Sequence, residues 1–328
     1  MISVAVQDQS QVAETRRKAG EIAERHGFGD VDAGRVALVA TELASNLIKH
    51  GGGGEVLLGT FGDTNETGIE LIALDKGPGM FDVAACLSDG YSTAGTAGKG
   101  FGAVVRLSHQ IDVASWPGLG TAVLSRLRRG QPSGDPLAVP RTGAVSVPKP
   151  GEEVCGDSWS VSCGPEGATL LLADGLGHGP DAAEAAVEAV RLFHRFNGHR
   201  LPVLLDYVHG GLRATRGAAV SLARLEKGSQ KILFTGIGNV AGVLFVNGEL
   251  RRMVSMPGTA GHNARKIQTF DYPFPSGLVI LHSDGLASSW TLQKYPDLAS
   301  KHPSLIAAVL YRDLARGRDD ATVLVAKW

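Results

Sequence analysis

The chain has 328 residues, of which 43% are hydrophobic and 20% are charged, and its formal net charge is −1. This length exceeds what one hydrophobic core usually fills, so two domains are expected. The near-neutral balance of charges gives no electrostatic argument for binding nucleic acid or an anionic membrane surface.

No targeting or membrane-spanning segment is predicted. The first residues, MISVAVQDQSQ, lack the basic and apolar regions of a signal peptide, and no apolar run approaches the ~18 residues of a membrane span. Cys86, Cys155 and Cys163 form no close metal-type pair, which favours reduced thiols. We therefore expect a cytoplasmic protein.

Two helices are predicted at the start of the chain. Residues 8–26 have an amphipathic pattern, and Asp32 is a fair N-cap for a second helix that runs to about His50. Glu42, Asn46 and His50 are spaced four residues apart, so they share one stripe of that helix. A solvated helix face is the alternative interpretation of Glu42 and Asn46.

The next feature is a strand that ends in an acid and glycines. Strands are predicted at 55–61 and 68–73, and the second leads into Asp75, Gly77 and Gly79. Glycine allows the backbone to approach a flat ligand, so this arrangement predicts a binding site. The alternative is a tight surface turn with a solvated carboxylate.

A glycine-rich stretch at 92–102 then precedes an apolar helical pattern that starts at Ala103. Backbone N–H groups and the helix dipole favour an anion at such a place. A dinucleotide-type motif is excluded because no apolar strand precedes the glycines, and a Walker loop because no Ser or Thr follows Gly-Lys. A hairpin over 111–115 and 121–127 follows, and then a linker at 131–140 rich in Pro, Gly and Ser.

Three strand ends in the second half carry acids. The run LLLADGLGHG, Leu170 to Gly179, is an apolar strand that ends at Asp174; a second apolar strand ends at Asp284, and Asp319 and Asp320 precede the last strand. Acids gathered at strand ends are what hard divalent cations require. Surface Asp-Gly turns are the alternative.

The rest of the second half alternates strands with two consecutive helices, which indicates a sandwich of sheets flanked by helix pairs. Strands are predicted at 143–147, 218–225, 231–236, 241–246, 266–270, 278–282 and 321–325, and helices at 180–196, 202–215 and 303–316.

In the first domain, three features occur in a characteristic order: Glu42-x3-Asn46, Asp75-x-Gly77-x-Gly79 and the Gly95–Gly102 loop. Together they resemble the GHKL ATP-binding domain, a Bergerat α/β sandwich, of histidine-kinase and gyrase-type ATPases. The stretches Thr41–Asn46, Asp75–Gly79 and Asp89–Gly95 resemble more closely the serine kinases of the anti-sigma-factor class, especially RsbT-like switch kinases. It implies a domain over residues 1–130 that binds ATP with Mg²⁺.

The resemblance also implies roles for individual residues. Glu42 acts on the incoming serine hydroxyl as a base or orienting group, and Asn46 holds Mg²⁺. Asp75 accepts a hydrogen bond from the adenine amino group, and Thr121 lines the adenine pocket. Gly77 and Gly79 let the backbone pass the base. The residues expected to wrap the phosphates are Gly98, Lys99, Gly100 and Gly102. Lys99 and Phe101 depart from the smaller or more apolar residues expected there.

The second domain resembles the PP2C-type Ser/Thr phosphatases in the compact SpoIIE/RsbX branch. The matching pieces are Gly156-Asp157, residues 173–179, Ser283-Asp284-Gly285 and residues 318–322. The resemblance implies a β-sandwich flanked by helices over residues 141–328. The expected fold class is therefore a two-domain α/β (α+β) protein.

This second resemblance implies two divalent cations, Mn²⁺ or Mg²⁺. Asp174 bridges them and His178 protonates the serine leaving group, while a turn histidine is the alternative for His178. The implied metal ligands are Asp157, Asp174, the carbonyl of Gly175, Asp284 and Asp319. No phosphate-binding arginine stands out near the start of the domain, in contrast to larger PP2C enzymes.

The combined expectation is a bifunctional regulator that phosphorylates and dephosphorylates STAS-domain antagonist proteins in a partner-switching pathway. A sigma factor or a stressosome component is a further expected partner, whereas nucleic acid and membrane are not. Two alternatives stay open: a phosphatase gated by a nucleotide-sensing but non-catalytic GHKL domain, and a GHKL module that sequesters a sigma factor or antagonist.

Overall fold

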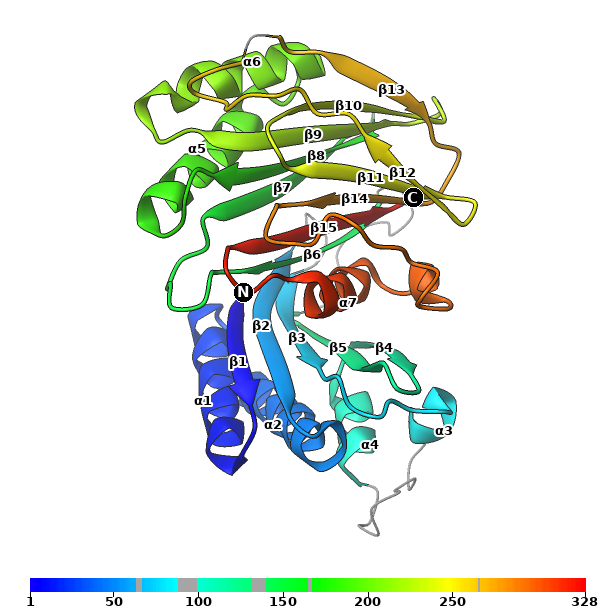
Figure 1. Ribbon diagram of the computed structural model, residues 1–328. Coiled ribbons are helices and arrows are strands. Elements are labelled where there is room, and N and C mark those ends of the chain that lie inside the picture. Colours follow the sequence, from blue (N-terminus) through cyan, green and yellow to red (C-terminus); the bar gives the residue numbers. More distant parts are fainter. Residues whose placement is uncertain (63–66, 88–98, 131–139, 165–166, 265) are drawn as a thin grey trace. The chain divides into compact units, whose positions relative to one another are not determined.

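The computed structural model describes residues 1–328 apart from 63–66, 88–98, 131–139, 165–166 and 265 (Figure 1). The chain forms two compact units. Unit 1 contains Met1–Pro136 and Ser300–Arg312, and unit 2 contains Leu137–Ala299 and Asp313–Trp328. The sequence-based boundaries place all of 141–328 in the second domain, whereas the segment Ser300–Arg312 packs with unit 1.

Unit 1 is built on one antiparallel sheet of five strands in the order β1-β2-β3-β5-β4. The strands are β1 (Ile2–Val6), β2 (Gly54–Gly62), β3 (Thr67–Leu74), β4 (Gln110–Trp116) and β5 (Gly120–Arg128). The helices of its N-terminal segment are α1 (Gln9–Arg25), α2 (Asp30–Asn46), the π-helical turn η1 (Leu47–Gly51), α3 (Val83–Leu87) and α4 (Lys99–Leu107).

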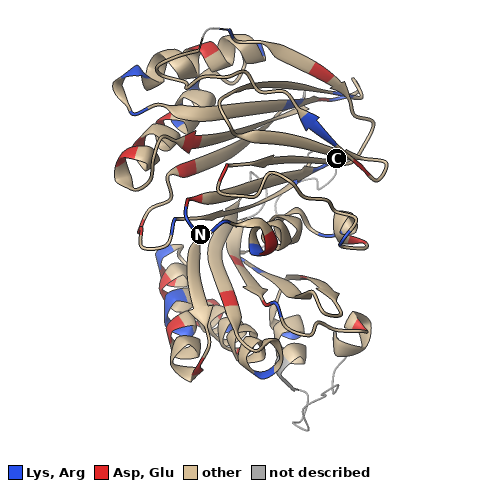
Figure 2. Ribbon diagram, viewed as in Figure 1, with Lys and Arg blue, Asp and Glu red and all other residues tan. Residues whose placement is uncertain are grey.

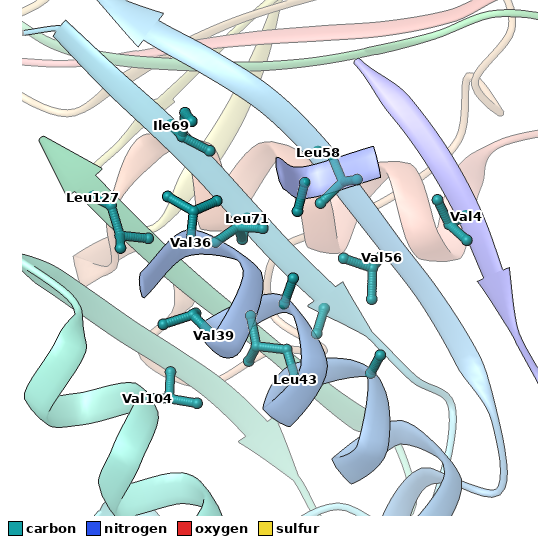
Figure 3. Close-up of a cluster of buried hydrophobic side chains, with 14 of the residues drawn as sticks. Val4, Val36, Val39, Leu43, Val56, Leu58, Ile69, Leu71, Val104 and Leu127 are labelled. Carbon is teal, nitrogen blue, oxygen red and sulfur yellow. The ribbon is translucent and has the colours of Figure 1, made fainter. Parts of the chain in front are cut away.

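Strand alternation divides this sheet into two faces. Val56, Leu58 and Leu71 point toward α2, where Val39 and Leu43 complete the buried cluster shown in Figure 3. The residues that alternate with these along each strand point to the opposite face of the sheet. Helix α7 (Pro303–Leu314), whose residues up to Arg312 belong to unit 1, lies on that second face.

The helices of unit 1 begin and end differently from the prediction in places. Asp8 caps α1 through a capping box with Gln11, which fixes the predicted start of that helix. Helix α2 starts at Asp30 with Gly29 at the N-cap position, so Asp32 lies in the first turn instead of capping it. Strand β1 was not predicted. Along α1, basic and acidic side chains alternate (Figure 2), as expected for a solvated helix face with the Arg17–Glu21 ion pair.

Unit 2 is a sandwich of two antiparallel sheets, ordered β13-β10-β9-β8-β7 and β12-β11-β14-β15-β6. The first sheet contains β7 (Asp157–Gly164), β8 (Gly167–Gly175), β9 (Ala218–Glu226), β10 (Lys231–Ile237) and β13 (Thr269–Pro273). The second contains β6 (Arg141–Val147), β11 (Ala241–Val246), β12 (Glu249–Met253), β14 (Leu278–His282) and β15 (Ala321–Lys327). The helical elements are α5 (Pro180–Phe196), α6 (Leu201–Gly211) and the short 3-10 turns η2 (Leu212–Ala214) and η3 (Leu298–Ser300).

The two faces of strand β8 serve different cores. Leu171 and Ala173 pack against α5 and α6, whereas Leu170 and Leu172 pack between the two sheets. Because side chains alternate along a strand, Asp174 continues the series of Leu170 and Leu172 and points to the space between the sheets. The fold class predicted from the sequence is confirmed, and the pattern delivers a carboxylate to the end of the inter-sheet core.

Among the residues that the structure describes, no helix is both long enough and apolar enough to cross a membrane.

Candidate active sites

The candidate nucleotide site in unit 1 is organised around Asp75, which directly follows β3. Its Oδ1 accepts hydrogen bonds from the backbone N–H of Gly77 (2.8 Å) and of Thr121 (3.1 Å). Burial raises the pKa of this carboxyl, and the two backbone hydrogen bonds oppose the shift, as do the nearby Arg312 and His50. Both bonds reach Oδ1, which leaves Oδ2 to accept a hydrogen bond from a ligand.

Glycine is required around Asp75 because backbone segments approach closely. A Cβ on Gly77 would lie 2.7 Å from the carbonyl oxygen of Gly51, and one on Gly79 would lie 2.1 Å from that of Trp116. Gly79 also has a positive φ of 71°, which side chains rarely adopt. These contacts fix the turn after Asp75 against η1 and the β4–β5 hairpin, as a rigid cradle for a flat group requires.

Glu42 and Asn46 lie one helical turn apart on α2, and both are partly exposed. Asn46 is the last α-helical residue, and η1 begins directly after it, where the sequence predicts a helix that continues to His50. Single π-helical turns often mark functional sites, because the extra residue redirects the chain. Here η1 brings Gly51 against the side chain of Asp75.

The predicted phosphate loop is only partly described. Gly98 lies outside the described residues, and Lys99, Gly100 and Gly102 belong to α4, whereas the sequence predicts them in a loop before a helix at Ala103. The helix starts earlier because two glycines do not prevent helix formation when Phe101 and Val104 pack against the core. Thr121 is buried, and its side-chain oxygen lies 2.9 Å from that of Ser115.

The candidate metal site in unit 2 begins with two aspartates in register. Asp157 opens β7 and is directly opposite Asp174 at the end of β8. Gly175 follows, and its N–H donates to the carbonyl of Gly156 at 3.1 Å. A Cβ on Gly175 would lie 2.1 Å from the carbonyl oxygen of Ala182, so only glycine allows α5 to begin this close to the strand.

Asp284 and Asp319 approach the same pair from the second sheet. Asp284 follows β14 and accepts a hydrogen bond from Asn239 Nδ2 at 2.6 Å, while Asp319 precedes β15. The two strand ends are tied together, since Thr322 N donates to Ser283 Oγ at 3.0 Å. The four carboxylates therefore come from both sheets of the sandwich and meet at one end of it.

The electrostatics of the carboxylates indicates that they lie close together. Burial raises the pKa of Asp174, and the negative charges of Asp157, Asp284 and Asp319 raise it further. Burial also raises the pKa of Asp157 and of Asp284. Such crowding of acids is unfavourable without a counter-charge, and a divalent cation is the charge that suits oxygen ligands.

Orphaned oxygens provide a second test of whether a cation fits. Within the part of the chain that the structure describes, Asp157 Oδ2 and Asp320 Oδ2 are buried without a hydrogen-bond partner. Buried polar atoms are rarely left so, and a cation bound at Asp157 would give its free oxygen a partner. In that part of the chain, no group of three or more acidic, histidine or cysteine side chains is already arranged to hold a metal ion.

His178 lies on the loop between β8 and α5, next to the acids. Its Nδ1 is 2.6 Å from Glu152 Oε1, and its side chain is 46% exposed, so the other ring nitrogen can meet a substrate. Arg216 lies beside the same loop: its Nη1 is 3.3 Å from the position of a Cβ on Gly177, and its Nη2 is 2.5 Å from Asp181 Oδ2.

Sequence reasoning missed Glu152, Arg216 and Asn239 as members of this site. None of them lies in a local motif with the acids, and each reaches the site through a turn from a different part of the chain. The only sequence signal was indirect, because the two charged residues flank glycine-rich turns in which a solvated charge is equally common.

Comparison with known proteins agrees with this geometry. Residues 5–126 match the family model of the histidine kinase-like ATPase domain, and residues 164–328 match that of stage II sporulation protein E (SpoIIE). The serine/threonine-protein kinase RsbT of Bacillus subtilis (strain 168) is 32% identical over 120 residues, which are 37% of this chain and 90% of RsbT.

Two solved structures extend the comparison. A chain from a study of the bacterial stressosome is 26% identical with a TM-score of 0.54, over 57% of this chain and 99% of that one. The PP2C phosphatase domain of SpoIIE from Bacillus subtilis, with a fragment of its regulatory domain, is 16% identical with a TM-score of 0.50, over 97% of this chain and 92% of that one, a likeness of fold. The chain therefore belongs to the SpoIIE family, with a PP2C-type phosphatase domain that follows a histidine kinase-like ATPase domain related to RsbT.

Proposed function

We propose that this protein is a bifunctional signalling regulator that both phosphorylates and dephosphorylates serine or threonine on protein substrates. Unit 2 is the metal-dependent phosphatase, and unit 1 is an ATP-dependent kinase. The observation that carries the proposal is the convergence of Asp157, Asp174, Asp284 and Asp319 from two sheets, where burial and the neighbouring negative charges raise the pKa of the first three.

In the phosphatase unit, the four aspartates and the carbonyl of Gly175 would hold two Mn²⁺ or Mg²⁺ ions. When bound, the cations supply Lewis acidity and a nucleophilic water for phosphoester hydrolysis. His178 donates a proton to the departing serine oxygen, and Glu152 holds the imidazole through Nδ1 at 2.6 Å. Arg216 binds the phosphoryl oxygens with a guanidinium that is 52% exposed, which supplies the arginine that no sequence motif indicated.

In the kinase unit, Oδ2 of Asp75 accepts from the adenine amino group, and Gly77 and Gly79 let the backbone pass the base. Thr121 closes the pocket, Asn46 holds Mg²⁺, and Glu42, one turn earlier on α2, accepts the proton of the incoming hydroxyl. The phosphates are assigned to Lys99, Gly100 and Gly102 of α4, together with Gly98, which lies outside the described residues.

The proposed substrate class rests on the resemblance of both domains to partner-switching kinases and phosphatases. RsbT is a serine/threonine-protein kinase, and a second relative comes from the stressosome. We therefore assign STAS-domain antagonist proteins as substrates, in a cytoplasmic partner-switching pathway in which a sigma factor or a stressosome component is the further partner.

Transfer of label from ATP to candidate STAS proteins tests the kinase. The wild type should label a serine or threonine, and Glu42→Ala and Asn46→Ala should not. ATP binding without transfer would replace the kinase with a nucleotide sensor that gates the phosphatase. Stable capture of an antagonist or sigma factor without turnover would favour a sequestering module.

Release of phosphate from a phosphorylated STAS protein tests the phosphatase. It should require Mn²⁺ or Mg²⁺ and should be lost in Asp174→Asn. Full activity in that variant would refute the assignment of the metal site.

A further inference from the structure

Helix α7 occurs within the phosphatase part of the sequence, yet residues Ser300–Arg312 belong to unit 1. The segment lies within the residues that match the SpoIIE family, 164–328, but it packs with the ATPase unit. Its contacts with the second face of the unit 1 sheet are specific and polar.

The first half of the segment is fixed to strands β4 and β5. The N–H of His302 donates to Asp112 Oδ2 at 2.7 Å, and Lys301 Nζ lies 3.4 Å from the other oxygen of that carboxylate. Arg126 donates to Ser304 Oγ at 2.9 Å and to Glu70 Oε2 at 2.6 Å. Because Arg126 and Glu70 are buried, this network holds α7 in one register on the sheet.

The second half of the segment reaches the nucleotide site. Tyr311 donates its hydroxyl to Glu55 Oε1 at 3.0 Å, and Arg312 Nη1 donates to the carbonyl oxygen of Asp75 at 3.0 Å. Gly120 leaves room for that carbonyl, since a Cβ there would lie 2.1 Å from it. The buried Arg312 guanidinium thus fixes the peptide between Asp75 and Lys76, where the adenine-binding turn begins.

The residues that directly follow Arg312 belong to unit 2 and hold the loop of a metal ligand. Leu314 accepts a hydrogen bond from Ala287 N at 2.8 Å, and Arg316 N donates to Gly285 O at 2.9 Å. Leu286 and Ala315 form a β-bridge between these two bonds. Gly285 is the neighbour of Asp284, and Asp319 lies a short way further along the same chain.

We propose that Arg312 is a positioning residue of the nucleotide site, and that α7 links adenine nucleotide binding in unit 1 to metal binding and phosphatase activity in unit 2. A helix is a rigid element. In its last turn, Arg312 is bonded to Asp75 of unit 1, and Leu314, two residues later, is bonded to the loop that follows Asp284 in unit 2. Rigid elements of this kind carry coupling between sites. Linkage requires that each ligand changes the affinity of the other by the same factor.

The first test measures hydrolysis of p-nitrophenyl phosphate by the full chain, with Mn²⁺ in excess over nucleotide. A saturating non-hydrolysable ATP analogue should change kcat/KM at least about fivefold, the low end of allosteric coupling. The corresponding GTP analogue has the same phosphates and chelates Mn²⁺ equally, so it should change nothing. Equal responses to both analogues would overturn the proposal.

Variants of α7 then assign the coupling to Arg312. At saturating analogue, Arg312→Met should reduce the response to less than about twofold. Arg312→Lys should keep part of it, because lysine retains one donor. Tyr311→Phe is the matched control, since it removes a neighbouring bond of the same helix without touching Asp75, and it should respond as the wild type does. A full response in a folded Arg312→Met protein contradicts the linkage.

A reciprocal measurement leaves α7 intact. Affinity for the ATP analogue should differ at least about fivefold between metal-loaded wild type and Asp174→Asn. The inference rests on the proposed function, and the two fail differently. If the wild type does not bind the analogue or has no phosphatase activity, the function and the inference are both refuted. If it binds the analogue and is an active phosphatase, but neither ligand affects the other, the inference alone is refuted.

Discussion

Asp157 and Asp174 are directly opposite each other in the antiparallel pair of β7 and β8, and burial raises the pKa of both carboxyls. Opposite residues of such a pair have Cα atoms about 4.5–5.5 Å apart, which brings two acids together between the sheets. Asp284 and Asp319 add negative charge at the same point. The arrangement is unfavourable by itself and becomes favourable when divalent cations occupy it.

Asp174→Asn removes one negative charge from the proposed metal site. We expect phosphatase turnover to fall about 10³-fold or more, because the metals contribute several kcal/mol of transition-state stabilisation. The same substitution removes repulsion in the metal-free protein, so the free energy of unfolding should stay the same or increase. Steady-state kinetics together with denaturant unfolding in a chelator checks both parts, and a variant that is inactive because it is unfolded would contradict the second.

Without metal, unit 2 should become less stable as the pH rises. Folding raises the pKa of Asp157 and Asp174, mainly through burial, so above the ordinary value of 3.8 the folded state binds more protons than the unfolded chain. Stability is then lost with increasing pH, by at most about 1.4 kcal/mol per pH unit for each such proton. Thermal unfolding in a chelator should show this slope, and Asp157→Asn should reduce it. A flat profile in the wild type would mean that the acids do not crowd as described.

Much of this site followed from the sequence, because strand periodicity and the acids lie in one local pattern. Leu170 and Leu172 set the face on which Asp174 lies, and the predicted start and end of α5 match the structure. Strand β1 was missed because its five residues have too little alternation to identify a strand, and it is recognisable only through its pairing with β2. The roles of the individual site residues stay predictions.

What the sequence did not reveal is mainly long-range packing. The apolar pattern of α7 predicts a buried helix, but periodicity does not say which sheet it covers. Its place in unit 1 depends on polar partners such as Asp112 and Arg126, far away in sequence. Asn239 is similar, since its bond to Asp284 depends on a turn before β11 that no motif identifies.

Two glycines of the β4–β5 turn should respond differently to substitution by alanine. Both have positive φ, 75° at Gly118 and 79° at Gly120, which costs an L-residue about 1–2 kcal/mol. A Cβ on Gly118 meets nothing within 4 Å, whereas one on Gly120 would lie 2.1 Å from the carbonyl oxygen of Asp75. Gly120→Ala should therefore destabilise unit 1 by about 1–3 kcal/mol more than Gly118→Ala. It should also weaken binding of a fluorescent ATP analogue, which Gly118→Ala should leave intact.

Arg216 is expected to hold the substrate phosphate. Arg216→Gln should raise KM for a phosphoserine peptide about tenfold, since a hydrogen bond to a charged group contributes about 1.5–3 kcal/mol. Arg216→Lys should recover part of the loss. Arg191→Gln is the control, because Arg191 is an exposed arginine on α5 with a carboxylate partner of its own, Glu188. Equal effects of the Arg216 and Arg191 substitutions on KM would show that Arg216 does not hold the substrate phosphate.

Proton donation by His178 can be separated from metal chemistry through the leaving group. A serine alkoxide must be protonated as it departs, whereas p-nitrophenolate leaves readily without a proton.

His178→Asn should therefore slow hydrolysis of a phosphoserine peptide about 10²-fold and that of p-nitrophenyl phosphate only a few-fold, the size expected for one general acid. Glu152→Gln should show the same selectivity with a smaller loss, because it keeps the shape of the partner at 2.6 Å but weakens the hydrogen bond that holds the imidazole ring. His194→Asn, at a surface histidine of α5 bonded to Ser160, should affect neither substrate. Equal losses on both substrates in His178→Asn would show that the histidine supports the metal site, since only a proton donor distinguishes the two leaving groups.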